Sequence, residues 1–278
     1  MPPIAHEDPD DALTRALSDQ YDAFQALHEA WGSGAVYFNW GYVAHPGQTY
    51  AESQEQLVRE VFAAAAPTAG DVLVDVGFGS GQQDLWAAEH HAFARLHGFN
   101  ISARQVEHAT RRAADLGLGD RLRYHHQPAE DMRALADGAA DRMVAIECAP
   151  HFDRPRFYRE AARVLRPGGR LVLADISLSE WTGGLARRGA PDLRRMGQIA
   201  DNQAAWAPFF HTRELRNINA RTLPGCQRTV WHVLRGLPRI RSAAHRRHWL
   251  GLAAVSQLMA VGLLLRVIRY DLIVLERR

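Results

Sequence analysis

Short runs of apolar and β-branched residues alternate with amphipathic segments through the middle of the chain. The amphipathic segments repeat apolar residues at intervals of three and four, as helices do. The expected strands cover residues 71–76, 94–100, 121–126, 141–147 and 170–176, and the expected helices start at Gln82 and cover 102–116 and 154–165. This alternation is typical of a parallel sheet with helices on both faces. The middle of the chain is therefore predicted to be an α/β domain.

The N-terminal part is predicted to be helical before this alternation begins. Apolar residues repeat at helical intervals over 9–31, and Pro9 with two following aspartates suits a first helical turn. The segment 32–48 is rich in glycine and aromatic residues and is expected to be a loop. A second helix is expected over 50–65.

After residue 176 the alternation is lost, and the chain up to residue 265 is predicted to be mostly helical. One short run within it, 226–234, is the candidate for a sixth strand. The closing strand is expected at 268–276.

One apolar run near the C-terminus could belong to a membrane or to a core. It covers 249–265 and has 17 residues, the short end of what crosses a bilayer. Ser256 and Gln257 interrupt it, and a strand-like segment follows at once. We therefore interpret it as a buried helix.

Composition excludes several classes of protein. The 278 residues include 33 basic and 31 acidic side chains, so the formal net charge of +2 gives no sign of a nucleic-acid partner. With 47% hydrophobic and 23% charged residues, the chain is globular rather than disordered. The two cysteines are too few for a disulfide framework, and the chain starts with acidic residues where a signal peptide would be positive. These features predict a cytoplasmic protein.

A glycine-rich turn after the first expected strand is the strongest motif. The three glycines of VLVDVGFGSG (72–81) occupy alternate positions, and Asp75 precedes them. Glycines in a strand-to-helix turn let the backbone approach a ligand closely. No P-loop lysine follows, and Gln82 stands where the dinucleotide fingerprint has its last glycine. The ligand is therefore expected to be something other than a pyrophosphate.

This turn resembles the first motif of class I S-adenosylmethionine-dependent methyltransferases. Four further segments match that family in order: GFNISARQVEHA (98–109), PAEDM (128–132), IECAPHF (146–152) and REAARVLRPGGRLVLADI (159–176). The resemblance covers residues 35–176 and the closing strand. It is strongest for bacterial small-molecule O-methyltransferases of natural-product pathways, such as those acting on macrolide or indolocarbazole sugars.

The resemblance implies a doubly wound, Rossmann-like α/β fold. Its seven-stranded sheet would be mostly parallel, with an antiparallel final hairpin. The implied divisions are an N-terminal helical lid at 1–66, a cofactor-binding core at 67–176, a helical substrate cap with late sheet elements at 177–265 and a closing strand at 266–278.

The resemblance also implies S-adenosylmethionine as the cofactor. Asn100 stands where relatives have an acid that holds the ribose hydroxyls, and its amide oxygen can accept a hydroxyl proton without carrying charge. Backbone groups of Ala129 would meet the adenine edge. The residues implied to bind the cofactor are Asp75, Gly77, Gly79, Gly81, Asn100, Ile101, Gln105, Ala129, Glu130, Glu147, Tyr37 and Asn39. Structural roles remain the alternative: Asp75 as a cap of the glycine turn, Asn100 as a strand-end residue, and Tyr37 as a core aromatic.

A histidine and an aspartate are the candidates for acid–base chemistry. His151 follows the fourth expected strand, at the edge where open α/β sheets bind ligands. Histidine titrates near neutrality, so His151 is the candidate base for a hydroxyl acceptor. In the sugar methyltransferases that this segment resembles, a histidine and an aspartate serve in these places, and Asp175 would orient His151 or bind the acceptor. His45 and His211 are alternative bases, and no histidines and acids have metal-ligand spacing, so no metal is expected.

An arginine-rich stretch, 207–250, contains nine arginines and a single acid, Glu214. It suits a solvated helical face, a pocket for an anionic acceptor such as an isoprenoid diphosphate, or an interface with another subunit or an acidic carrier protein. The sequence leaves these three interpretations open.

The function predicted from these residues is transfer of a methyl group from S-adenosylmethionine to a small molecule. An oxygen of a sugar or polyketide-type secondary metabolite is the favoured acceptor. Carbon methylation of an isoprenoid diphosphate is one alternative. A methyltransferase-fold cyclase or binding protein that transfers no methyl group is another. No nucleic-acid partner and no membrane span are expected, and a homo-oligomer is left open.

Overall fold

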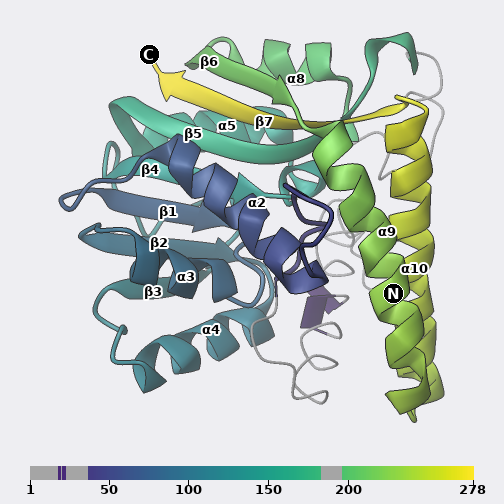
Figure 1. Ribbon diagram of the computed structural model, residues 1–278. Coiled ribbons are helices and arrows are strands. Elements are labelled where there is room, and N and C mark those ends of the chain that lie inside the picture. Colours follow the sequence, from purple (N-terminus) through teal and green to yellow (C-terminus); the bar gives the residue numbers. More distant parts are fainter. Residues whose placement is uncertain (1–17, 20, 23–36, 183–195) are drawn as a thin grey trace, which may run out of the picture.

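A seven-stranded sheet forms the centre of the computed structural model, which describes residues 18–19, 21–22, 37–182 and 196–278 (Figure 1). The strands are β1 (Val72–Val76), β2 (Arg95–Asn100), β3 (Leu122–His126), β4 (Ala140–Ile146), β5 (Leu165–Leu178), β6 (Phe210–Asn217) and β7 (Ile268–Arg277). They lie in the order β3-β2-β1-β4-β5-β7-β6. Pairs among β1 to β5 are parallel, whereas β7 is antiparallel to both β5 and β6. The predicted fold class is confirmed.

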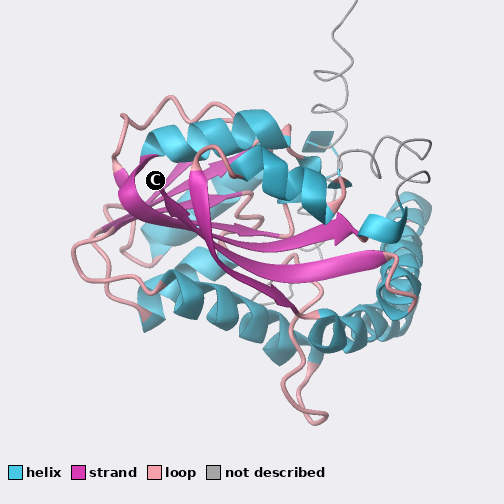
Figure 2. Ribbon diagram, turned by 90° about the horizontal axis from the view of Figure 1, so that it is seen from above, coloured by secondary structure: helices cyan, strands magenta, loops and turns pink. Residues whose placement is uncertain are grey.

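Helices cover both faces of this sheet (Figures 1 and 2). The longer helices are α2 (Tyr50–Ala65), α3 (Gln82–His90), α4 (Ala103–Asp115), α5 (Arg154–Val164), α8 (Ile199–Trp206), α9 (Asn219–Gly236) and α10 (Ala243–Leu264). Three short 3₁₀ helices are η1 (Ala149–His151), η2 (Glu180–Thr182) and η3 (Leu237–Arg239). Buried residues of α2, α3, α9 and α10 share one hydrophobic cluster, those of α5 and α8 share a second, and a small third cluster joins α9 to α10.

Alternation along each strand supplies the first two clusters, because successive side chains of a strand point to opposite faces. Leu73 of β1 packs in the cluster beneath α2, whereas its neighbour Val74 packs beneath α5. In β4, Val144 and Met143 divide in the same way. Burial on both faces explains why these central strands are almost continuously apolar in sequence.

Short polar side chains fix where several helices begin. Thr49 caps α2 in a capping box with Glu52, so two backbone N–H groups at the helix start gain partners. Ser102, Asp153 and Ser242 each accept a backbone N–H in the first turn of α4, α5 and α10. The caps of α4 and α5 set the loops that follow β2 and β4, where the cavity described below lies.

The sixth strand is not where the sequence pattern placed it. Residues 226–234 lie within α9, and the strand is Phe210–Asn217. The buried residues Cys226, Thr229 and Val233 recur at three and four, a helical period that the β-branched Thr229 and Val233 obscured. β6 lies at the edge of the sheet and most of its residues are exposed or half-buried, so its sequence is polar.

The apolar run 249–265 forms α10, but the prediction that it is buried is wrong for one face. Trp249, Met259 and Leu263 face the protein interior. Leu258 and Leu264 are 70% and 69% exposed. In the described part of the chain, no helix is long and apolar enough to cross a membrane.

The N-terminal helix expected over 9–31 lies mostly outside the described residues. Ser18, Asp19, Tyr21 and Asp22 are described and helical. The second expected helix is α2, and its bounds agree with the prediction. The proposed division of the chain into lid, core and cap stays a prediction.

Candidate active site

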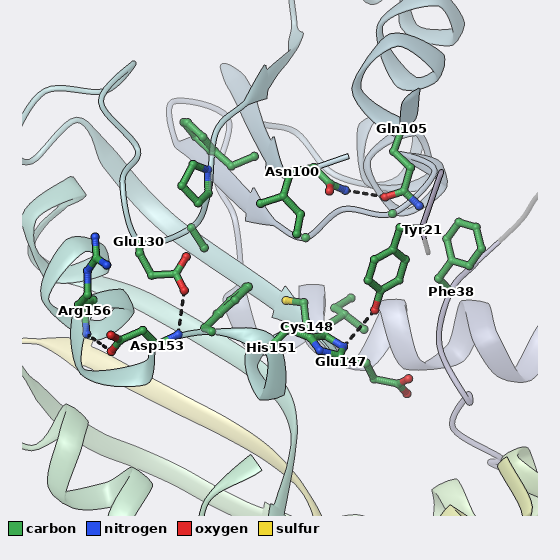
Figure 3. Close-up of a pocket in the computed structure, with 18 residues that line it drawn as sticks. Tyr21, Phe38, Asn100, Gln105, Glu130, Glu147, Cys148, His151, Asp153 and Arg156 are labelled. Carbon is green, nitrogen blue, oxygen red and sulfur yellow. Dashed lines mark hydrogen bonds between the residues drawn. The ribbon is translucent and has the colours of Figure 1, made fainter. Parts of the chain in front are cut away.

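A cavity of about 250 Å³ opens at the carboxyl ends of β1, β2 and β4 (Figure 3). In the sheet, β2 and β3 lie on one side of β1, and β4 and β5 lie on the other side. The loops after β1 and β4 therefore diverge and leave a crevice between them, as in other open α/β sheets. Its lining residues are Tyr21, Phe38, Gly77, Gly79, Phe99, Asn100, Ile101, Gln105, Pro128, Ala129, Glu130, Ile146, Glu147, Cys148, His151, Phe152, Asp153 and Arg156.

The glycine turn after β1 forms one wall. Gly77, Gly79 and Gly81 have φ angles of +69°, +59° and +74°, which residues with a side chain rarely adopt. A Cβ at Gly77 would lie 2.5 Å from the Cβ of Cys148, and one at Gly79 would lie 2.8 Å from the ring of Phe38. Gly77 and Gly79 line the cavity, whereas Gly81 starts α3 and lies outside the lining. The turn therefore presents bare backbone to any ligand.

Asp75 lies behind the glycine turn rather than in the cavity wall. It is fully buried on β1, and its carboxylate accepts a hydrogen bond from the side chain of Gln83. Burial raises the pKa of Asp75 to about 6. Burial and the neighbouring Asp75 also raise the pKa of Asp84, because two carboxylates cannot both ionise at close range. The pair therefore gives up its protons at higher pH than exposed carboxyls do.

Two amides form the wall after β2. The Asn100 Nδ2 donates to Oε1 of Gln105 at 2.8 Å, and the Asn100 Oδ1 accepts the backbone N–H of Ser102 at 3.0 Å. The Gln105 Nε2 is buried and has no hydrogen-bond partner within the described residues. A buried donor without a partner is costly, so a ligand oxygen beside Gln105 would supply what this group lacks.

Residues after β3 and at the start of α5 form the opposite wall. Ala129 is buried beside Pro128, so backbone rather than a charged side chain faces the cavity there. An oxygen of Glu130 accepts the backbone N–H of Asp153 at 2.8 Å, and burial raises the pKa of the Glu130 carboxyl. The sequence pattern did not indicate that Arg156 borders the cavity.

His151 ends η1 and borders the cavity as predicted from its place after β4. Its Nε2 lies 3.1 Å from the hydroxyl oxygen of Tyr21 (Figure 3). Burial raises the pKa of Tyr21, so its phenol is neutral and can donate to an unprotonated Nε2. The apolar period over 9–31 did not indicate that the hydroxyl of Tyr21 lies beside His151.

Asp175 does not border the cavity. Its carboxylate is buried and forms a two-pronged ion pair with Arg154, with N–O distances of 2.6 and 3.1 Å. Arg154 also donates to the carbonyl of Ile176. Removing one partner from such a pair costs about 3–5 kcal/mol, because the other charge is left buried. The expected partnership of Asp175 with His151 stays a prediction, while this ion pair gives Asp175 a structural role.

Glu147 is a strained and half-buried acid at the cavity wall. Its φ is +57°, in the left-handed region that favours glycine. Its Oε1 accepts the backbone N–H of Trp40 at 2.9 Å and the hydroxyl of Tyr270 at 2.6 Å. Burial raises the pKa of Glu147 to about 8. Glu147 thus joins β4, β7 and the loop before α2 at one point.

Glu147→Gln should stabilise the protein at alkaline pH and have little effect at pH 4. The folded-state pKa is raised from 4.5 to about 8, so its stabilising contribution is full below 4.5 and is lost as pH rises through 8. The loss amounts to at most about 5 kcal/mol, at 1.4 kcal/mol for each pKa unit. Denaturant unfolding of both proteins across this range measures it. The matched surface change is Glu107→Gln; a pH-independent effect of Glu147→Gln would contradict the prediction.

Tyr37 and Asn39, which were expected to contact the cofactor, are not brought to the cavity. Both are buried, and the side-chain amide of Gln54 in α2 donates to their backbone carbonyls at 2.8 and 2.7 Å. Phe38, between them, points the other way and lines the cavity. Since neighbouring residues of an extended segment face opposite sides, packing of this segment on α2 selects Phe38.

The arginines of 207–250 lie away from the cavity. All nine belong to the described part of the chain, and none borders it. Arg213 pairs with Glu276 and Arg216 with Glu60, while Arg221 and Arg228 donate to backbone carbonyls of the loop before α2. This placement does not support the anionic-pocket interpretation.

The remaining histidine predictions concern metals and alternative bases. Neither His45 nor His211 borders the cavity. His125 bonds with His97 at 2.9 Å, and burial lowers the pKa of both rings. Among the described residues, no group of histidines, cysteines and acids could hold a metal ion.

Residues 74–173 match a family model described as a methyltransferase domain. The chain is 37% identical over 169 residues to "Methyltransferase GfsG" of Streptomyces halstedii, covering 60% of this chain and 59% of that protein. It is 35% identical over 157 residues to "Erythromycin 3''-O-methyltransferase" of Saccharopolyspora erythraea, covering 56% and 51%. The match thus spans between half and two thirds of the length of these relatives.

Solved structures share the fold over nearly the whole chain. The [4+2]-cyclase SpnF matches with a TM-score of 0.76 at 22% identity, covering 94% of each chain. Geranyl diphosphate C-methyltransferase from Streptomyces coelicolor A3(2) matches with a TM-score of 0.74 at 17% identity, covering 99% of this chain and 100% of that one. At such identities the likeness establishes the fold.

Proposed function

The chain carries a class I S-adenosylmethionine-dependent methyltransferase domain, and we propose that it methylates a hydroxyl group of a sugar or polyketide-type small molecule. One observation carries the proposal. A single cavity is lined both by the bare backbone of Gly77 and Gly79 and by His151. A ligand held by the turn would therefore share its space with a group that can accept a proton.

The residues present suit S-adenosylmethionine. When bound, it supplies an electrophilic methyl group on a sulfonium. The glycine turn would hold the methionine end of the cofactor. The buried Nε2 of Gln105, together with Asn100, would meet the ribose hydroxyls. Ala129 and Glu130 would meet the adenine. The unpaired donor of Gln105 supports this assignment, because it lacks a partner otherwise.

His151 accepts the proton of the acceptor hydroxyl in this proposal. The Tyr21 hydroxyl already lies at hydrogen-bonding distance from Nε2, so a second hydroxyl can approach the same nitrogen only by replacing Tyr21. Holding acceptor and base together in one cavity supplies positioning, which accounts for much of the rate in displacement reactions. The relatives named as O-methyltransferases support oxygen as the atom methylated.

The test is mass spectrometry of the full chain incubated with methyl-labelled S-adenosylmethionine and a panel of acceptors. Hydroxylated macrolides and their sugars form one arm, and prenyl diphosphates form the other. Label on a hydroxyl oxygen of the first arm supports the proposal. Label on carbon of a prenyl diphosphate would contradict it, as would a changed carbon skeleton without label, the result expected of a cyclase.

The two alternative functions differ in what they need from this chain. The carbon-methylation alternative needs cations for a diphosphate; Arg156 lines the cavity, whereas the arginines of 207–250 do not. Activity on a neutral sugar that survives single Arg→Ala changes in 207–250 would eliminate that alternative. The cyclase alternative needs no base at His151.

We also propose a cytoplasmic location, which is in keeping with two free cysteines. The small-molecule acceptor would enter past the N-terminal lid, residues 1–66, and be met by the cap, residues 177–265.

A further inference from the structure

An apolar stripe, in which Gln257 is the one exposed polar side chain, runs along the outer face of α10. Its exposed members are Leu250, Val255, Leu258, Val261 and Leu264 of α10 and Leu265 at its C-cap, with exposures of 46%, 50%, 70%, 42%, 69% and 62%. These positions recur at helical spacing, so they lie on one side of a helix of 22 residues, about 33 Å long. α10 stands beside α9 at one side of the molecule, away from the cavity helices α4 and α5 (Figures 1 and 2).

Positive charge gathers at the N-terminal end of this stripe, whereas Glu180 lines a hollow with Leu264 and Arg266 at the other end. Between Glu214 and Asp271 the sequence contains no acidic residue. Five exposed arginines cluster in sequence around the turn from α9 to α10, hereafter the basic turn: Arg235, Arg239, Arg241, Arg246 and Arg247. Of these, Arg246 and Arg247 occupy the N-terminal part of α10, whose dipole is positive there. That placement costs stability, so an external anion is its natural complement.

We propose that α10 and the basic turn dock on a bilayer surface that carries anionic phospholipids. α10 would lie in the plane of the interface, with the apolar stripe at the acyl boundary and the arginines among the phosphates. Spanning is not required, and no described helix is able to span.

Charge and polarity favour this occupant over a second copy of the chain. A symmetric pair would bring basic turns and apolar stripes together without a single carboxylate from this region to offset the arginines. Protein interfaces are also close to half polar, whereas Gln257 is the one exposed polar side chain of 250–265, a segment that is described throughout. An apolar face with arginine at its margin is the composition of interfacial helices.

Vesicle flotation of the full chain tests the proposal. Vesicles of phosphatidylcholine alone are compared with vesicles that also contain phosphatidylglycerol. The chain should float with the anionic vesicles, and added salt should weaken binding because it screens the charges. Leu258→Gln with Leu265→Gln should weaken it at least about tenfold. Arg241→Gln with Arg247→Gln should weaken it about fivefold for each arginine.

Matched controls come from the other end of the molecule. Leu116 after α4 is 60% exposed and Arg123 of β3 is also exposed, so Leu116→Gln and Arg123→Gln should leave flotation unchanged. Circular dichroism would confirm that all variants fold. Absence of flotation, or equal flotation of stripe and control variants, would overturn the proposal. So would a dimer in light scattering that Leu258→Gln dissociates, since the stripe would then belong to a second copy.

Discussion

His151→Ala should lower turnover by roughly 10²–10⁴, the usual contribution of a positioned acid–base group, while cofactor affinity changes little. The two effects separate because His151 lies on η1 after β4, whereas the glycine turn follows the neighbouring strand β1. Steady-state kinetics with labelled cofactor measure turnover, and calorimetry measures binding. Wild-type activity should also fall on the acid side of its pH profile, because a protonated imidazole cannot accept the hydroxyl proton.

Two variants provide controls for this prediction. His45→Ala removes an exposed histidine outside the cavity and should leave turnover unchanged. Asp175→Asn breaks the buried pair with Arg154, so it should cost about 3 kcal/mol or more in unfolding free energy. If Asp175 also orients His151, the pH profile of activity of Asp175→Asn should be shifted from that of the wild type. Near-normal turnover of His151→Ala with an unchanged pH profile would place the base elsewhere and favour a carbon-methylating or cyclising role.

The positions of the central strands could be predicted because these strands are buried on both faces. Their apolar runs stand out against the amphipathic helices between them, and the family motifs anchored each run. β6 lacked that signal, since an edge strand such as Phe210–Asn217 keeps polar side chains in solvent. The exposed face of α10 could not be predicted either, because an apolar sequence does not show which of its side chains other elements cover.

Cavity residues that the backbone conformation requires could be recognised in the sequence, whereas those that packing selects could not. Gly77 and Gly79 were found because a turn of positive φ requires glycine. Phe38 was missed in favour of its neighbours, because the choice depends on Gln54 of α2. Arg154 was missed because nothing in its sequence surroundings marks an arginine as buried. Its ion pair with Asp175 links α5 to β5, and only the folded chain brings these elements together.

Gly79→Val should abolish measurable binding of S-adenosylmethionine and of its demethylated product, a loss of at least about 100-fold or 2.7 kcal/mol. Gly79 has a φ of +59°, where a β-branched residue is strained, and its Cβ would lie 2.8 Å from the ring of Phe38. The added side chain must therefore displace Phe38 or the turn itself, and both border the cavity. Calorimetric titration with each ligand measures the loss.

Gly117→Val separates loss of the ligand surface from backbone strain alone. Gly117 has a similar φ of +68°, but a Cβ there meets nothing within 4 Å, and the residue lies outside the cavity lining. Its substitution should therefore lower stability by a similar strain while leaving both affinities intact. Gly79→Ala should fall between the two, because it adds the Cβ contact without the branch. Equal binding by Gly79→Val and wild type would show that the cofactor lies away from this turn, because no ligand held by the Gly79 backbone could tolerate the added side chain.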